Sequence, residues 1–174
     1  MSFIDLAKNR YSCRAFSAQP VEPEKLNAVL EAGRVSPTAK NQQPVKVYAI
    51  QTPAGLAKIR EATRMTYGAP VVLMVCYDES LCFNTQDVYK ENFTSGVMDA
   101  SIVATSMMME ATDLGLNTLW ARGFNANDIA RAMGIPANMK VACLLDVGYA
   151  DAEQGGPSPR HPSRKSMEEF SEKL

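Results

Sequence analysis

The chain has 174 residues, of which 46% are apolar and 21% are charged, and its formal net charge at pH 7 is −1. That length is enough for a hydrophobic core, so we expect a single domain over residues 1–174. A nearly neutral chain has no general attraction for nucleic acid, and no run of 18 apolar residues is present to span a membrane. We expect neither a nucleic-acid nor a membrane partner.

The chain begins with a short predicted helix, residues 2–9, in which Ser2 is a suitable N-cap and Asp5 lies in the first turn. The charges of Asp5, Lys8 and Arg10 interrupt the apolar stretch that a signal peptide requires. The first ten residues therefore predict a small amphipathic helix rather than a targeting segment, and we expect a cytoplasmic protein.

The five residues that follow this helix read Arg-Tyr-Ser-Cys-Arg. Because an extended backbone alternates its side chains, Arg10, Ser12 and Arg14 would share one face. Tyr11 and Cys13 would pack on the opposite side. Guanidinium groups bind phosphate through a planar fork of donors, and a serine hydroxyl adds a further contact. The motif is a candidate phosphate-binding segment, although taken alone it also fits a solvated basic turn.

A second helix and a polar loop come next. Pro23 suits the first turn of a helix over residues 23–33, and Gly33 suits its C-terminal cap. The loop Ser-Pro-Thr-Ala-Lys-Asn-Gln-Gln-Pro at 36–44 is rich in amide and hydroxyl groups. Such a loop is either a plain connection or a ligand contact, because loops often carry binding residues.

The middle of the chain supplies the predicted core. Residues 45–51 alternate as a strand does, a helix follows at 54–63, and the β-branched run at 70–77 is typical of a buried central strand. Residues 78–94 are polar and aromatic without a clear period, and they are a candidate flexible flap or lid. Residues 95–114 are apolar or small nearly all round, which predicts a long helix that is central or buried by a partner chain.

The last third completes the predicted sheet with a strand at 117–121, a helix at 127–133 and a strand at 141–149. The tail from residue 150 is rich in Gly, Pro and Ser until the segment Arg-Lys-Ser-Met-Glu-Glu-Phe at 164–170. Four strands separated by helices predict an α+β fold, with a mixed sheet that carries helices on its faces.

The cysteines and the histidine give little support for metal or hydrolytic chemistry. The four cysteines show no Cys-x-x-Cys spacing, and His161 is the only histidine, which argues against a zinc site and a Cys-His hydrolase. Cys76 and Cys143 lie in apolar runs and are expected to be buried thiols. We expect no metal site and assign no side chain as a nucleophile or general base.

Four separated pieces of the chain, in order, resemble the FMN-dependent nitroreductase family of NAD(P)H:flavin-type oxidoreductases. Arg-Tyr-Ser-Cys-Arg resembles the family's Arg-x-Ser-x-Arg/Lys opening, and the loop at 36–44 resembles its Pro-Ser-x-x-Asn-x-Gln-Pro loop. Residues 99–124 resemble its central helix, Gly-Leu turn and Trp-x-x-Gly segment. Residues 164–170 resemble its C-terminal Arg-Lys-Pro-Leu-Glu-Glu. The resemblance covers nearly the whole chain.

The resemblance implies a homodimer with a mostly antiparallel sheet, the long central helix at the dimer interface, and FMN tightly bound between the subunits. It implies that Arg10 and Ser12 hold the FMN phosphate and ribityl chain, and that Arg14 approaches the N1/O2 edge of the ring. Arg164 would complete the phosphate site, with Arg160 as a weaker candidate for the same contact.

Further implied flavin contacts lie elsewhere in the chain. They comprise Tyr11 within the first motif, Pro37, Thr38 and Asn41 reaching the flavin from the partner subunit, and Ala121, Arg122 and Gly123 along the N5 side of the ring. Some positions depart from the family pattern: Val45 stands where Trp is common, Arg122 where some members carry Glu or Gly, and Ser166 replaces the usual Pro. These departures bear on substrate choice more than on flavin binding.

The implied activity is oxidation of NADH or NADPH, as a transient donor, with reduction of a nitroaromatic, quinone or similar small aromatic acceptor. The flavin would carry the chemistry in two steps at one shared cleft, in a ping-pong manner. The absence of a Gly-x-Gly-x-x-Gly fingerprint fits such sharing. The alternatives are a flavin-binding storage or sensor protein without turnover, and another flavin chemistry such as flavin breakdown or reductive dehalogenation.

Overall fold

The computed structural model describes residues 2–84 and 93–174. The elements in chain order are α1 (Phe3–Asn9), α2 (Pro23–Arg34), η1 (Ala39–Asn41), β1 (Val45–Ile50), α3 (Pro53–Ala62), β2 (Val71–Asp78), α5 (Gly96–Asp113), β3 (Asn117–Ala121), α6 (Ala126–Met133), β4 (Met139–Gly148) and α7 (Met167–Phe170). Each helix and strand predicted from the hydrophobic pattern is present, with ends that agree within two residues.

A four-stranded sheet in the order β1-β2-β4-β3 forms the centre of the molecule. The three pairs of neighbouring strands are all antiparallel, and the one parallel pairing in the described residues is the isolated bridge between Ser12 and Thr118. The predicted α+β fold with a mostly antiparallel sheet is confirmed. β2 lies inside the sheet with both faces covered, and for this reason its sequence is apolar without alternation.

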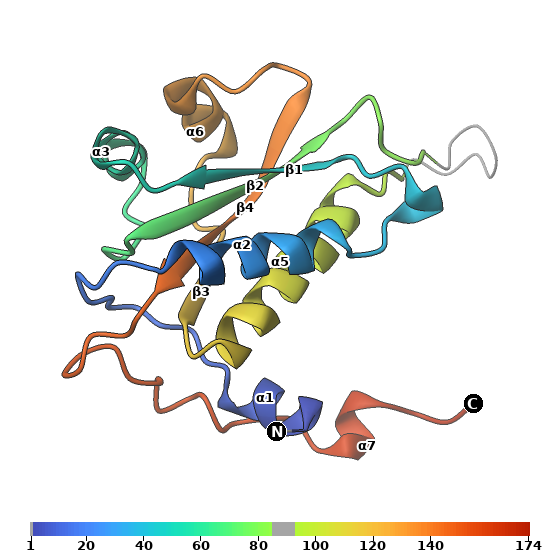
Figure 1. Cartoon of the computed structure of the whole chain (residues 1–174). Helices are drawn as coiled ribbons and strands as arrows, with labels where there is room; N and C mark the ends of the chain where they lie inside the picture. Colours follow the sequence, from blue (N-terminus) through green and yellow to red (C-terminus); the bar gives the residue numbers. More distant parts are fainter. Residues whose placement is uncertain (1, 85–92) are drawn as a thin grey trace.

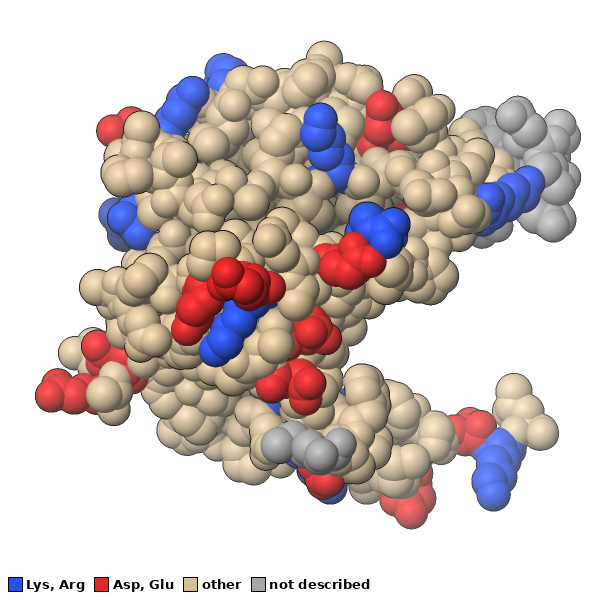
Figure 2. All heavy atoms as spheres, viewed as in Figure 1, with Lys and Arg blue, Asp and Glu red and all other residues tan. Residues whose placement is uncertain are grey.

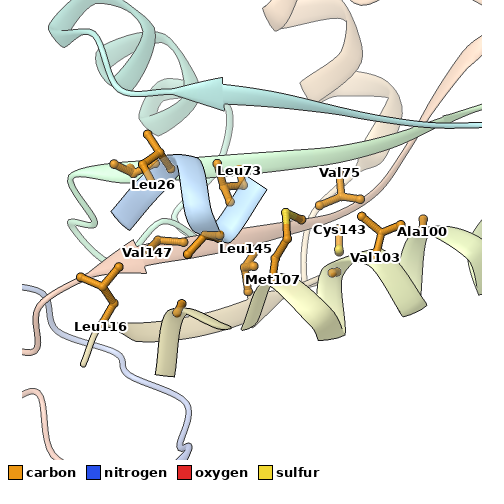
Figure 3. Packing of buried hydrophobic residues seen from close by; sticks show 14 residues of the cluster. Leu26, Leu73, Val75, Ala100, Val103, Met107, Leu116, Cys143, Leu145 and Val147 are labelled. Carbon is orange, nitrogen blue, oxygen red and sulfur yellow. The ribbon is translucent and has the colours of Figure 1, made fainter. Parts of the chain in front are cut away.

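Helices cover both faces of the sheet (Figure 1). α2 and α5 pack on one face, where Leu73 of β2 and Leu145 of β4 meet Met107 of α5 (Figure 3). α3 and α6 pack on the opposite face around a second apolar cluster. Cys76 and Cys143 are buried free thiols, as predicted.

The role of Gly33 differs from the prediction. α2 continues to Arg34, so Gly33 is a buried helical residue rather than the C-terminal cap. A Cβ atom at Gly33 would lie 2.8 Å from Cγ of Met107, and the missing side chain is what lets α2 approach α5 closely. The glycine has a structural role, as predicted, but that role is close packing of two helices and not capping.

The predicted flap is described only at its two ends. Ser95 N–H donates to the carbonyl of Phe83 at 2.9 Å, and residues 84 and 94 form an antiparallel bridge. Residues 85–92 lie outside the described residues, so the flap prediction is untested. α5 is buried on one side only, and Val97, Met98 and Ile102 are exposed on the other.

The face of the molecule drawn in Figure 2 carries charges of both signs. On the face in Figure 2, acidic and basic side chains are interspersed and much of the area carries neither. Among residues 2–84 and 93–174, no helix has the length and apolarity needed to cross a membrane.

Candidate functional site

The first motif and the C-terminal segment meet in a depression of about 530 Å³. Its lining residues are Arg10, Tyr11, Ser12, Arg14, Ser158, Pro159, Arg160, His161 and Arg164. The two chain ends run beside each other at this point (Figure 1), joined by a hydrogen bond of 3.0 Å between Nε2 of His161 and the carbonyl oxygen of Lys8. All six predicted site residues of these two segments therefore lie together.

The first motif is held in an extended form by the edge of the sheet. Cys13 N–H donates to the carbonyl of Thr118 in β3 at 3.0 Å, and Cys13 is fully buried. The alternation predicted from the strand period therefore holds for Arg10, Ser12 and Arg14, which line the depression while Cys13 points into the core.

Tyr11 does not turn away with Cys13. Its ring lines the depression and meets the ring of His161 edge-on, with 6.2 Å between the ring centroids. The prediction that Tyr11 packs into the interior is therefore wrong, because the C-terminal segment supplies a neighbour on the outer side. His161 is part of the site as well, and sequence reasoning had no local signal for it.

The depression is strongly positive. None of its four arginines forms an ion pair with a carboxylate in the described part of the chain. Burial, and then the positive charge of Arg164, lower the pKa of Arg10 from its usual value. Arg164 is itself oriented by hydrogen bonds to the carbonyls of His161 and Ser163, the latter at 2.6 Å. Repulsion between nearby guanidiniums is relieved when an anion binds between them.

These donors fit the phosphate of FMN. A phosphate monoester carries nearly two negative charges and several acceptor oxygens, and several guanidiniums with a serine hydroxyl satisfy both requirements. The candidate phosphate residues are Arg10, Ser12, Arg160 and Arg164, because all four line the depression. Both Arg160 and Arg164 face it, so the weaker candidate is as well placed as the stronger one.

The polar loop at 36–44 is held by a buried carboxylate. Asp99 of α5 accepts a hydrogen bond of 2.9 Å from the backbone N–H of Ala39, and one of 2.6 Å from the hydroxyl of Ser95. Asp99 is 2% exposed. In the sequence it reads as an interruption of an apolar helix, whereas in the fold it fastens the candidate loop to α5.

The backbone of this loop adopts an uncommon conformation. Lys40, Asn41 and Gln43 have φ angles of 52°, 54° and 51°, in the left-handed region that residues with side chains rarely occupy. A hydrogen bond of 3.0 Å from Gln43 N–H to the hydroxyl of Thr38 closes the turn. The exposed side of the loop carries Pro37 and Asn41.

The loop at 36–44 and the arginine depression are separate places in one chain. Thr38 lines a groove of about 320 Å³ with residues of α2 and β1, and no arginine of the depression lines that groove. The loop and the first motif therefore line different hollows of the chain.

The third predicted segment, residues 121–123, lies where β3 ends. Ser12 of the first motif forms a β-bridge with Thr118, near the start of this strand. Residue 122 comes four positions after Thr118, so it lies roughly 13 Å along the strand from that bridge. Arg122 Nη1 donates to the carbonyl of Phe124 at 3.0 Å, and its guanidinium carbon lies 5.0 Å from the centre of the Phe124 ring. Its side chain is thus directed along residue 124 and not toward the depression.

Comparison with known proteins identifies the fold and the family. The model of the Nitroreductase family matches residues 7–66 and 62–149, which together make up most of the chain. The chain belongs to the nitroreductase family. The family predicted from the sequence is confirmed, and the pieces at 10–14, 36–44 and 99–124 lie within the matched residues, whereas the piece at 164–170 lies beyond them.

Relatives and solved structures extend this result. An NADPH-dependent oxidoreductase of Staphylococcus epidermidis is 28% identical, over 91% of this chain and 69% of its own length. The crystal structure of a nitroreductase family protein from Clostridium difficile 630 has a TM-score of 0.90 and 33% identity, covering 99% of this chain and 98% of the other. A protein of Exiguobacterium sibiricum solved in complex with FMN has a TM-score of 0.81 and 20% identity, covering 100% of this chain and 98% of its own, and it shares the fold.

Proposed function

We propose that this protein is an FMN-dependent NAD(P)H oxidoreductase that reduces nitroaromatic, quinone or similar small acceptors in a ping-pong reaction. The observation that carries the proposal is the depression where four arginines and Ser12 converge without a carboxylate partner among the described residues. The NADPH-dependent oxidoreductase of S. epidermidis and the FMN complex from E. sibiricum agree with the choice of donor and cofactor.

The chain's own residues supply position and charge. Arg10, Ser12, Arg160 and Arg164 would hold the phosphate, and Arg14 lies on the same face next to them, where it would meet the ring side of the cofactor. When bound, FMN supplies the redox chemistry, taking two electrons from NAD(P)H and giving them to the acceptor. Arg14 would stabilise negative charge on the reduced ring, which favours the reduced form.

We further propose that the working form is a homodimer. The loop at 36–44 does not line the arginine depression of its own chain, so it would complete the site of the partner subunit. The exposed apolar side chains on α1, α5 and α7 support this arrangement, since such surfaces usually mark an interface. They are Phe3, Ile4, Val97, Met98, Ile102, Met167 and Phe170.

The activity is tested by mixing the FMN-loaded protein with NADH or NADPH under anaerobic conditions in a stopped-flow instrument. We expect the oxidised flavin absorbance to disappear with either or both donors and to return when a quinone or nitroaromatic is added. A protein that keeps FMN but is not reduced by either donor would instead be a flavin-binding protein without turnover.

The cofactor site is tested by Arg10→Ala. Loss of one charged donor to the phosphate should weaken FMN binding by about tenfold or more, measured by titrating the flavin-free protein with FMN. Arg64→Ala removes an exposed positive charge outside the depression and serves as the control. Equal FMN affinity in the Arg10 variant and the wild type would refute the assignment.

A further inference from the structure

Another hollow, of about 290 Å³, lies between α6 and the adjoining ends of β2 and β4. Arg122, the residue after β3, lines it together with Ala130 of α6, Ile135, and Val141 of β4. Arg122 therefore faces walls that are in part apolar. A pocket of this size is at the small end of the range for ligand sites and has room for a small molecule.

Of the two cations that line this pocket, one has no carboxylate partner among the described residues. Lys140 also lines it, but its Nζ lies 3.4 Å from a carboxylate oxygen of Glu79, so these two charges offset each other. Arg122 has no carboxylate within ion-pair distance in the described part of the chain. Its hydrogen bond to the carbonyl of Phe124 uses a single N–H of a group that has five, and its contact with the Phe124 ring uses none.

We infer that this pocket binds a small aromatic carboxylic acid, with the guanidinium of Arg122 on the carboxylate and the ring against Ala130, Ile135 and Val141. A single net positive charge beside apolar walls matches a monoanion with a hydrocarbon body better than a phosphate. A planar guanidinium also pairs with a carboxylate through two parallel hydrogen bonds.

The pocket would select acceptors for the reaction. This role rests on the proposed function and on the family resemblance, which implies that residues 121–123 lie along the N5 side of the flavin. An acid held by Arg122 would then be anchored next to the redox centre, and anionic aromatic acceptors would be preferred over neutral ones of the same shape. Binding of the acid itself does not depend on the redox activity.

The binding step is tested by calorimetric titration of the protein with benzoate and with benzyl alcohol, which has a similar shape and no charge. We expect saturable benzoate binding at least tenfold tighter than that of benzyl alcohol. Arg122→Gln should weaken benzoate about tenfold and leave benzyl alcohol within twofold. Arg131→Gln, which removes an exposed α6 cation that does not line the pocket, should change neither.

A substitution that fills part of the pocket gives a second test of where the acid binds. Ala130→Leu adds bulk to the wall and should weaken both compounds. Unchanged benzoate binding in Arg122→Gln or in Ala130→Leu, or the absence of saturable binding to the wild type, would overturn the inference.

The role in turnover is measured with 4-nitrobenzoate and 4-nitrobenzyl alcohol as competing acceptors for the FMN-loaded enzyme and NADPH. The ratio of their kcat/KM values should fall about tenfold in Arg122→Gln. A ratio that does not change would refute the selective role. If neither acceptor is reduced, the proposed function fails, while the benzoate titration still decides whether the pocket binds an acid.

Discussion

Asp146 of β4 provides the sharpest test of the energetics of this fold. The residue is fully buried between β2 and β3, and neither of its carboxyl oxygens has a hydrogen-bond partner among the described residues. Burial raises its pKa from 3.8 to about 8, because the charged form has lost its contact with water. The folded protein therefore holds a proton on Asp146 at a pH where the unfolded chain does not.

The sign of the pH effect follows from proton binding. Between the two pKa values the folded state binds more protons than the unfolded state, so the free energy of unfolding falls as the pH rises. The slope is about 1.4 kcal/mol per pH unit for one group, which gives a loss of about 2.7 kcal/mol from pH 5 to pH 7. The loss is complete once the pH exceeds about 8.

Asp146→Asn removes the titrating group while keeping a similar shape. Urea unfolding of the variant and the wild type at pH 5, 6 and 7 measures the effect, with the variant expected to gain about 2.7 kcal/mol relative to the wild type over that range. Asp113→Asn, at an exposed carboxyl at the end of α5, is the control and should show no such gain. A difference between Asp146→Asn and wild type that stays flat with pH would refute the reasoning.

Two further substitutions test the packing around the candidate site. Gly96→Ala should cost about 1–3 kcal/mol of stability and lower the melting temperature, because a Cβ there would lie 2.5 Å from Cε2 of Tyr77. Gly156→Ala is the control and should leave the melting temperature unchanged, because a Cβ there would meet no atom within 4 Å. Asp99→Ala should cost about 1–3 kcal/mol by urea unfolding, since it leaves a partly buried backbone N–H of the loop unpaired, and should hasten tryptic cleavage after Lys40. Unchanged stability and cleavage would show that Asp99 does not hold the loop.

Much of the fold could be predicted because the hydrophobic pattern of each segment matches the period of the helix or strand that it forms. Periodicity located α1, α2, α3, α5, α6 and the four strands, since a side chain's burial repeats with the geometry of its own backbone. It did not locate the short helices η1 and α7. The same rule placed Arg10, Ser12 and Arg14 on one face. It failed for Tyr11, which is next to His161, a neighbour from the far end of the chain.

The sequence by itself determined the order of the elements, the apolar character of β2 and the presence of a cationic motif near the N-terminus. Only the tertiary structure brought Arg10 close to Arg164, turned Arg122 toward the pocket beside α6, and left Asp146 without a partner. The physical reason is that charge, burial and hydrogen bonding depend on neighbours distant in the sequence. Those neighbours are set by how the helices pack on the sheet and by where the two ends of the chain meet.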